Sequence, residues 1–190
     1  MRFSVLGFAG MFALLTGQAS AATEVVTHFG DLPWCTSARA TVDQANQLLT
    51  RNQTEISNTL PTAFKLIELG DTYAQCARQL SQIHADPSQQ GAQLSLMLDA
   101  LELSTEANFT ATRAAALLID LSPTSKRTAD ERFLFASAAH GALQYASLLR
   151  QNDPKPQQVS RVTEIQSNVA QLVPVYGADQ LGVIYQGIPQ

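Results

Sequence analysis

Apolar residues recur at intervals of three and four positions through most of the chain beyond residue 35. This spacing places them on one side of an α-helix, and helix is the only regular structure that the pattern fits well. We therefore predict an all-α fold, in which residues 23–190 form a single-domain antiparallel bundle of about five helices. The residues that mark the five helices in turn are Val42, Ala45 and Leu49; Phe64, Ile67, Ala74, Ala77 and Leu80; Leu94, Leu98, Leu101, Ala115 and Leu118; Phe133, Ala136, His140, Leu143 and Ser147; and Val159, Val162, Ile165, Val169 and Leu172.

Capping and turn residues indicate the limits of the first two helices. The first is expected to cover residues 36–51, entered from a threonine or serine cap. The second is expected to start from Asn58 or Thr59 as its N-cap, with Pro61 in the first turn, where proline is tolerated. The sequence thus predicts a break between these helices near residues 52–58.

Similar signals limit the later helices. Asp86 and Pro87 suit the start of a third helix that ends at the Leu-Ser-Pro sequence of residues 121–123. Thr128 and Glu131 have the spacing of a capping box and begin the fourth helix.

The last part of the chain is expected to hold one more long helix and a tail. Residues 152–156, which include two prolines, separate the fourth helix from the fifth. Pro174 is expected to end the fifth, because proline lacks the amide hydrogen that a helix interior needs. Residues 175–190 then form either a short helix or an extended tail.

The first 22 residues have the layout of a secretory signal peptide. An apolar run at residues 5–15 follows Arg2, and small residues at 19–22 supply a cleavage site, so the mature chain is expected to begin at Ala22 or Thr23. The run is about half of the roughly 20 residues that cross a bilayer. The protein is therefore expected to be secreted or periplasmic, with no membrane span after cleavage.

Export changes how the two cysteines are interpreted. In an oxidising compartment, Cys35 and Cys76 are most simply a structural disulfide. Closing a loop of about 40 residues would stabilise the fold by roughly 3 to 4 kcal/mol. The alternative is a reactive or ligating thiol, but neither a C-x-x-C pair nor a nearby histidine accompanies either cysteine. The midpoint of the two positions falls between residues 55 and 56, which agrees with a helix break there.

Charge argues against one class of partner. The formal net charge of −4 becomes −5 without the leader, and three lysines and nine arginines are scattered along the chain. A nucleic-acid binder needs a basic face, so no nucleic-acid partner is expected. The three histidines, His28, His84 and His140, form no metal-binding motif, so neither a metal nor another cofactor is predicted.

The middle of the third helix is unusual because polar residues interrupt its apolar side. Glu102 and Glu106 lie one turn apart, and such a pair can serve as acid and base when it lines a cleft. Arg113 and His140 complete a candidate catalytic site between the third and fourth helices. The alternatives are a solvated helix face for the glutamates and a hydrogen-bonded core histidine for His140.

Other residues are candidates for contact with a partner. Asn108 and Phe109 belong to the polar third helix, and Tyr176 and Tyr185 lie in the tail, where aromatic side chains either close the bundle or anchor an interface. Asn52 and Asn108 also begin N-x-S/T triplets, which are weak signals for glycosylation.

Three functional hypotheses remain. The first is an exported bundle that binds another protein, as an inhibitor, immunity factor, chaperone or secretion accessory. The second is an enzyme that uses the carboxylate and histidine site, and the third is a carrier of a small apolar ligand, which requires an internal cavity. The first is favoured, because the sequence contains no recognisable nucleophile, metal or cofactor motif.

Overall fold

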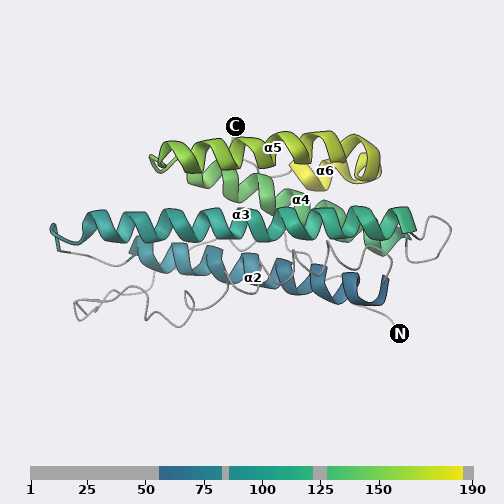
Figure 1. Ribbon diagram of the computed structural model, residues 1–190, viewed down its shortest axis with the longest axis horizontal. Helices are drawn as coiled ribbons and strands as arrows, with labels where there is room; N and C mark the ends of the chain where they lie inside the picture. Colours follow the sequence, from purple (N-terminus) through teal and green to yellow (C-terminus); the bar gives the residue numbers. More distant parts are fainter. Residues whose placement is uncertain (1–55, 83–85, 122–127, 186–190) are drawn as a thin grey trace.

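The computed structural model describes residues 56–82, 86–121 and 128–185, and all regular structure within them is helical (Figure 1). Four long helices, α2 (Ile56–Gln82), α3 (Gln90–Leu121), α4 (Thr128–Arg150) and α5 (Pro156–Tyr176), precede the 3-10 turn η2 (Ala178–Gln180) and the short α6 (Leu181–Tyr185). This confirms the all-helical prediction for the described ranges. The helix predicted over residues 36–51 lies outside them.

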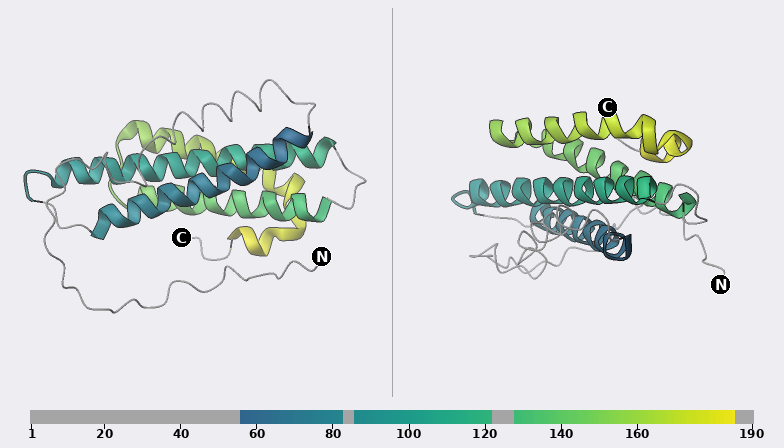
Figure 2. Two further views of the ribbon diagram at one scale, coloured as in Figure 1. Left: turned by 90° about the horizontal axis from the view of Figure 1, so that it is seen from below. Right: turned by 45° about the vertical axis from the view of Figure 1, so that its right-hand side comes forward.

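The helix α3 is the centre of the bundle. It packs against α2, α4 and α5, and successive long helices run in opposite directions (Figure 1). Consequently α3 and α5, which are separated by α4 in the chain, run in the same direction. The helix α6 turns back and packs on α4 (Figure 2).

Alanine fills much of the interior between these helices. The buried alanines come from α2, α3 and α4, and they allow helix axes to approach closely while retaining high helix propensity. Larger side chains fill the remaining space, among them Leu66, Leu118 and Phe135. The buried alanines are Ala63, Ala74, Ala77, Ala100, Ala107, Ala111, Ala114, Ala115, Ala116, Ala136, Ala138, Ala139, Ala142 and Ala146.

The starts of two helices differ from the prediction. The helix α2 already includes Ile56, so Asn58 and Thr59 lie inside it and are not its N-cap. The third helix begins at Gln90 and not at Asp86, because residues 86–89 form a turn in which the Asp86 carbonyl accepts hydrogen bonds from Gln89 and Gln90 N–H, 2.7 and 3.1 Å long. The helix α4 begins at Thr128, as predicted.

The end of the fifth helix also differs. Pro174 lies within α5, which continues to Tyr176. Proline lacks only its own N–H donor, whereas Gly177 N–H still donates to the Val173 carbonyl, 2.8 Å away. Of the two alternatives for the tail, its described part forms η2 and α6, which is the short helical form.

Two aromatic residues that mark predicted core stripes face outward. Phe64 is 58% exposed and Phe133 is 56% exposed. On α2 the other stripe residues Ala74, Ala77 and Leu80 are buried as predicted, so only Phe64 departs from the stripe. On α4 the buried aromatic is Phe135, two positions after Phe133. The predicted apolar stripe of α4 therefore differs from the side that is buried. The cause is that alanine is only slightly apolar, so a buried side made largely of alanine is difficult to recognise in the sequence.

Cys76 is buried on α2. Its predicted partner, Cys35, lies outside the described residues, so the disulfide stays a prediction. None of the helices in the described ranges has the length and apolarity needed to cross a bilayer.

Candidate functional site

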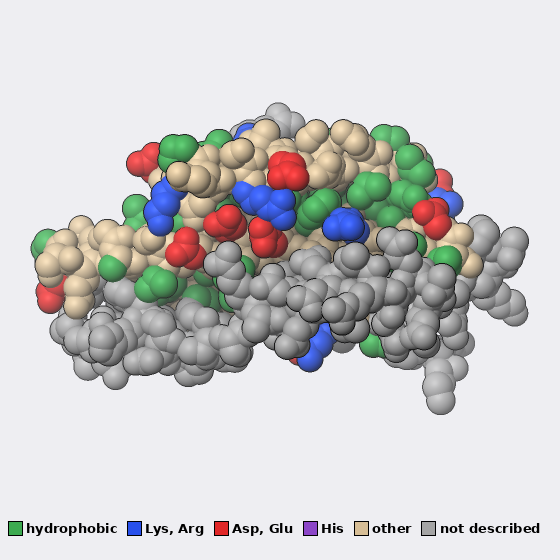
Figure 3. Space-filling model, viewed as in Figure 1, with side chains coloured by type: hydrophobic (Ala, Val, Ile, Leu, Met, Phe, Trp, Pro, Cys, Tyr) green, Lys and Arg blue, Asp and Glu red, His purple; other side chains and the backbone are tan. Residues whose placement is uncertain are grey.

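The structure places Glu102 and Glu106 against α5 and not in a cleft beside α4. The buried side chain of Gln158 donates from Nε2 to Asp99 Oδ1 and to Glu102 Oε2, both at 3.1 Å. Arg161 Nε donates to Glu106 Oε1 at 2.9 Å. Acidic and basic side chains accordingly gather where α3 and α5 meet (Figure 3). Both glutamates therefore serve as helix-to-helix contacts.

Arg161 is held on both sides by carboxylates. Besides Glu106 it contacts Glu164, at 3.0 Å from Nη1. Burial lowers the pKa of the guanidinium, but the hydrogen bonds and negative charge of Glu106 and Glu164 outweigh this effect and raise the pKa. Arg161 therefore acts as a permanent cation that joins α5 to α3.

The other two candidates for a catalytic site are directed elsewhere. His140 Nδ1 lies 2.8 Å from the carbonyl oxygen of Ile184, so Nδ1 carries a hydrogen and donates it to α6. Arg113 is exposed on α3. Among the described residues no hydrogen bond joins Glu102 or Glu106 to His140. The arrangement supports the alternative of a hydrogen-bonded histidine that fixes a neighbouring helix.

Asn108 and Phe109, predicted as partner contacts, are both buried. Asn108 is 1% exposed and lies between two glycines of neighbouring helices, Gly70 on α2 and Gly141 on α4. Its Nδ2 donates to the Ser104 carbonyl at 3.0 Å, and Ser104 Oγ donates to the Gly70 carbonyl at 2.7 Å. These polar residues join helices inside the fold, and the surroundings of Asn108 leave no space for a glycan.

The two tail tyrosines have different environments. Tyr176 is half-buried, its ring is tilted against Phe135 with centroids 5.7 Å apart, and its hydroxyl donates to Asp120 Oδ2 at 2.8 Å. That hydrogen bond, with some burial, raises the pKa of Tyr176. Tyr185, in contrast, is 56% exposed. Of the two, Tyr185 is the one available to a partner.

One polar pair was not suggested by the sequence. Tyr145 on α4 donates its hydroxyl hydrogen to Asp71 Oδ1 on α2, at 3.0 Å. Burial raises the pKa of Asp71, although the hydrogen bond from Tyr145 lowers it in part. Burial and the nearby Asp71 charge raise the pKa of Tyr145. The two residues are 74 positions apart, and only the packing of α2 beside α4 brings them together.

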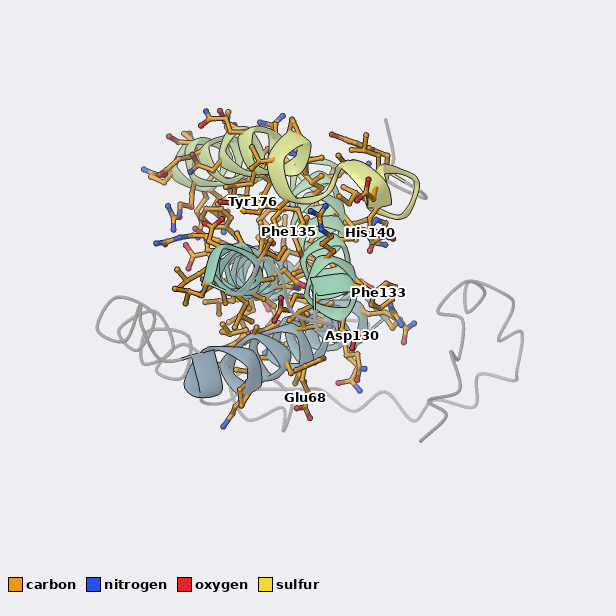
Figure 4. The ribbon with its side chains drawn as sticks, turned by 90° about the vertical axis from the view of Figure 1, so that its right-hand side faces the viewer. Glu68, Asp130, Phe133, Phe135, His140 and Tyr176 are labelled. Carbon is orange, nitrogen blue, oxygen red and sulfur yellow. The ribbon has the colours of Figure 1, made fainter. Side chains whose placement is uncertain are left out.

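Large apolar side chains are exposed on α4 and on α6, two elements that pack against each other. Phe133, Leu181 and Tyr185 are large, apolar and exposed, and we refer to them as the α4–α6 surface. Figure 4 views the bundle from the end at which α4 begins. Phe135 lies among the helices, and Phe133 lies at the outer side of α4. The sequence pattern places Phe133 in the core, so its exposure on this surface was not predicted.

Several contacts fix the two elements of this surface relative to each other. Arg132 Nη1 forms an ion pair with Asp179 Oδ2 at 3.0 Å, which joins the start of α4 to η2. Ile184 is buried, and its carbonyl accepts the hydrogen bond from His140. These contacts hold η2 and α6 against α4, the helix that carries Phe133.

Within the described ranges, no three His, Cys, Asp or Glu side chains are arranged to hold a metal ion. Comparisons with protein-family models, with curated proteins and with solved structures give no match to this chain.

Proposed function

We propose that this chain is an exported protein that acts by binding another protein through the α4–α6 surface. The observation that carries the proposal is the exposure of Phe133, Leu181 and Tyr185 on two elements that are fixed together. Large aromatic and aliphatic side chains supply most of the binding energy at protein interfaces, so exposed ones on two packed elements are candidates for contact with a partner.

The sequence supports the exported location through its leader. The role is that of an inhibitor, immunity factor, chaperone or secretion accessory, all of which act through a surface. Glu102 and Glu106, the carboxylate pair of the enzyme hypothesis, bond to α5 through Gln158 and Arg161, and this favours binding over catalysis.

Site-specific photo-crosslinking in the native host tests this proposal. A photoreactive phenylalanine analogue replaces Phe133 in one variant, and Leu94, which is exposed near the start of α3, in a matched control. We expect one dominant adduct from position 133 that is absent from position 94. Mass spectrometry of the adduct then identifies the partner.

A binding titration with the purified partner completes the test. Phe133→Ser and Tyr185→Ser should each weaken binding by about tenfold or more, as loss of an interface anchor does, whereas Leu94→Ser leaves the Kd unchanged. Equal crosslinking from both positions, or an unchanged Kd for both surface variants, would contradict the proposal.

A further inference from the structure

The side of α3 that meets α5 carries a line of charged residues, one of which has no partner. Glu106, Arg113 and Asp120 are separated by seven positions each, so they lie along one side of the helix. Glu106 accepts a hydrogen bond from Arg161 of α5, and Asp120 accepts one from Tyr176. Arg113, midway between them, is exposed and forms no hydrogen bond or ion pair with the described part of the chain. The line therefore contains one cation that the fold does not use.

The facing side of α5 does not supply a counter-ion for Arg113. The two bonds define a parallel register, in which a residue of α3 faces the residue 55 or 56 positions later in the chain. Position 113 then faces Asn168, which is half-buried, and one turn further Leu117 faces Leu172. Because the amide of Asn168 carries no charge, the guanidinium of Arg113 is not neutralised from α5.

Apolar side chains adjoin this position. Leu117 and Leu172 are half-buried, and Val175, seven positions after Asn168 on the same side of α5, is 64% exposed. In Figure 3, charged side chains gather over the first part of the line where α3 and α5 meet, and hydrophobic side chains gather over the later part. We call Arg113, Leu117, Asn168, Leu172 and Val175 the α3–α5 rim.

We propose that the α3–α5 rim binds an acidic, partly apolar segment of another protein. Arg113 donates two hydrogen bonds to a carboxylate of that segment, because a guanidinium matches the geometry of a carboxylate. The Asn168 amide is a further donor at the same level, and Leu117 and Val175 contact an apolar side chain of the segment. The inference is independent of the proposed function, because no residue of the rim belongs to the α4–α6 surface.

Charge favours this occupant over two others. A second copy placed symmetrically on the rim would bring Arg113 against its own counterpart, and like charges in contact oppose association. An anionic membrane is a continuous surface that would also meet Glu106, Asp120 and Glu164, whose carboxylates it repels. A single carboxylate at Arg113 lies about 10 Å along the helix from Glu106 and Asp120, a separation at which salt screens most of the repulsion.

Selection from a random peptide library on the intact purified protein tests the inference. From the wild-type protein we expect peptides that carry Asp or Glu three or four positions from a large apolar residue. Arg113→Glu should select Lys or Arg in place of the acid, because the cation has become an anion. Arg78→Glu is the matched control: Arg78 is also exposed on a helix, α2, and its variant should select the same peptides as wild type.

A binding titration then measures the contact directly. Replacing the acid of the best selected peptide by its amide should weaken binding to wild type by about tenfold or more, and should leave binding to Arg113→Gln unchanged. Phe133→Ser should not alter the Kd, which separates the rim from the α4–α6 surface. All the substituted side chains are exposed, so the variants retain the fold.

Three results would overturn the inference. They are weaker peptide binding in Phe133→Ser, selection of the same peptides by Arg113→Glu as by wild type, and enrichment of no peptide at all. In the last case, binding to phosphatidylglycerol vesicles would assign the rim to a membrane, and dimers in size-exclusion chromatography would assign it to a second copy.

Discussion

Asn108 shows how single residues set the distance between helices in this bundle. Its amide fills the space that Gly70 and Gly141 leave, and a Cβ atom at either glycine would collide with it. A glycine inside a helix lowers helix stability by about 1 kcal/mol relative to alanine. At these two positions that loss accompanies the space that the buried Asn108 amide needs.

Gly141→Ala tests that interpretation. We expect a loss of about 1 to 3 kcal/mol in the free energy of unfolding, since the methyl group overlaps Asn108. In the Asn108→Ala background the same change should become stabilising, because the obstacle is gone and the propensity gain remains. Gly91→Ala is the control: nothing lies within 4 Å of its Cβ position, so it should stabilise in either background. Urea unfolding measures all of these variants, and an equal effect of Gly141→Ala in both backgrounds would contradict the interpretation.

Asp71 gives a prediction for pH. The folded state raises its pKa above the ordinary value of 3.8, so the folded protein holds this proton more tightly than the unfolded chain. As pH rises through the interval from 3.8 to the raised value, the unfolded state ionises first, and the contribution of Asp71 to stability falls. Asp71→Asn keeps an acceptor for Tyr145 and removes this part of the pH dependence. Unfolding free energies of both proteins between pH 3 and 7 should show wild type losing stability relative to the variant, and parallel curves would disprove the shift.

At the scale of elements, α5 is attached to the bundle in two ways. Val162, Ile165 and Val169 bury its apolar side, while Gln158 and Arg161 bond to acidic residues of α3. These acidic residues repeat every three or four positions, so the periodic sequence suggested a solvated side or a site. The sequence pattern does not indicate that α5 is the helix facing these acidic residues, because that depends on the path of the chain through α4.

Gln158 is the central residue of this attachment. Gln158→Ala should lower the free energy of unfolding by about 1 to 3 kcal/mol, because the carboxylates of Asp99 and Glu102 lose their shared donor in a half-buried position. The adjacent Gln157 is exposed, and Gln157→Ala should change stability by less than about 0.5 kcal/mol. Equal effects of the two substitutions in chemical denaturation would show that the contact contributes little.

At the scale of the whole molecule, the end of the bundle near η2 contains two phenylalanines of α4 that differ in burial. Phe135 is fully buried and packs with Tyr176, whereas Phe133, two positions earlier, lies outside. The same type of side chain thus has two roles, determined only by the direction in which each position faces.

A pair of substitutions makes this distinction measurable. Phe135→Ala should destabilise the fold by about 3 to 5 kcal/mol through the cavity that it leaves. Phe133→Ser should change the free energy of unfolding by less than about 0.5 kcal/mol, so that any loss of binding arises from the surface alone. Thermal unfolding checks both, and a large loss for Phe133→Ser would mean that this residue belongs to the core.

The sequence by itself determined the secondary structure of the described residues, because helical periodicity and caps are local properties. It placed the start of α4 and the end of α3 correctly, and it missed the starts of α2 and α3 and the end of α5 by a few residues. At those positions a turn or a single proline competes closely with one more helical turn. Tertiary structure decided which residues form sites. Glu106 with Arg161, Tyr145 with Asp71, and Asn108 with its two glycines are all pairs of distant positions. Their contacts depend on which sides of the helices meet. Because alanine side chains are small, several rotations of a helix about its axis have nearly equal packing energy until the whole bundle is assembled.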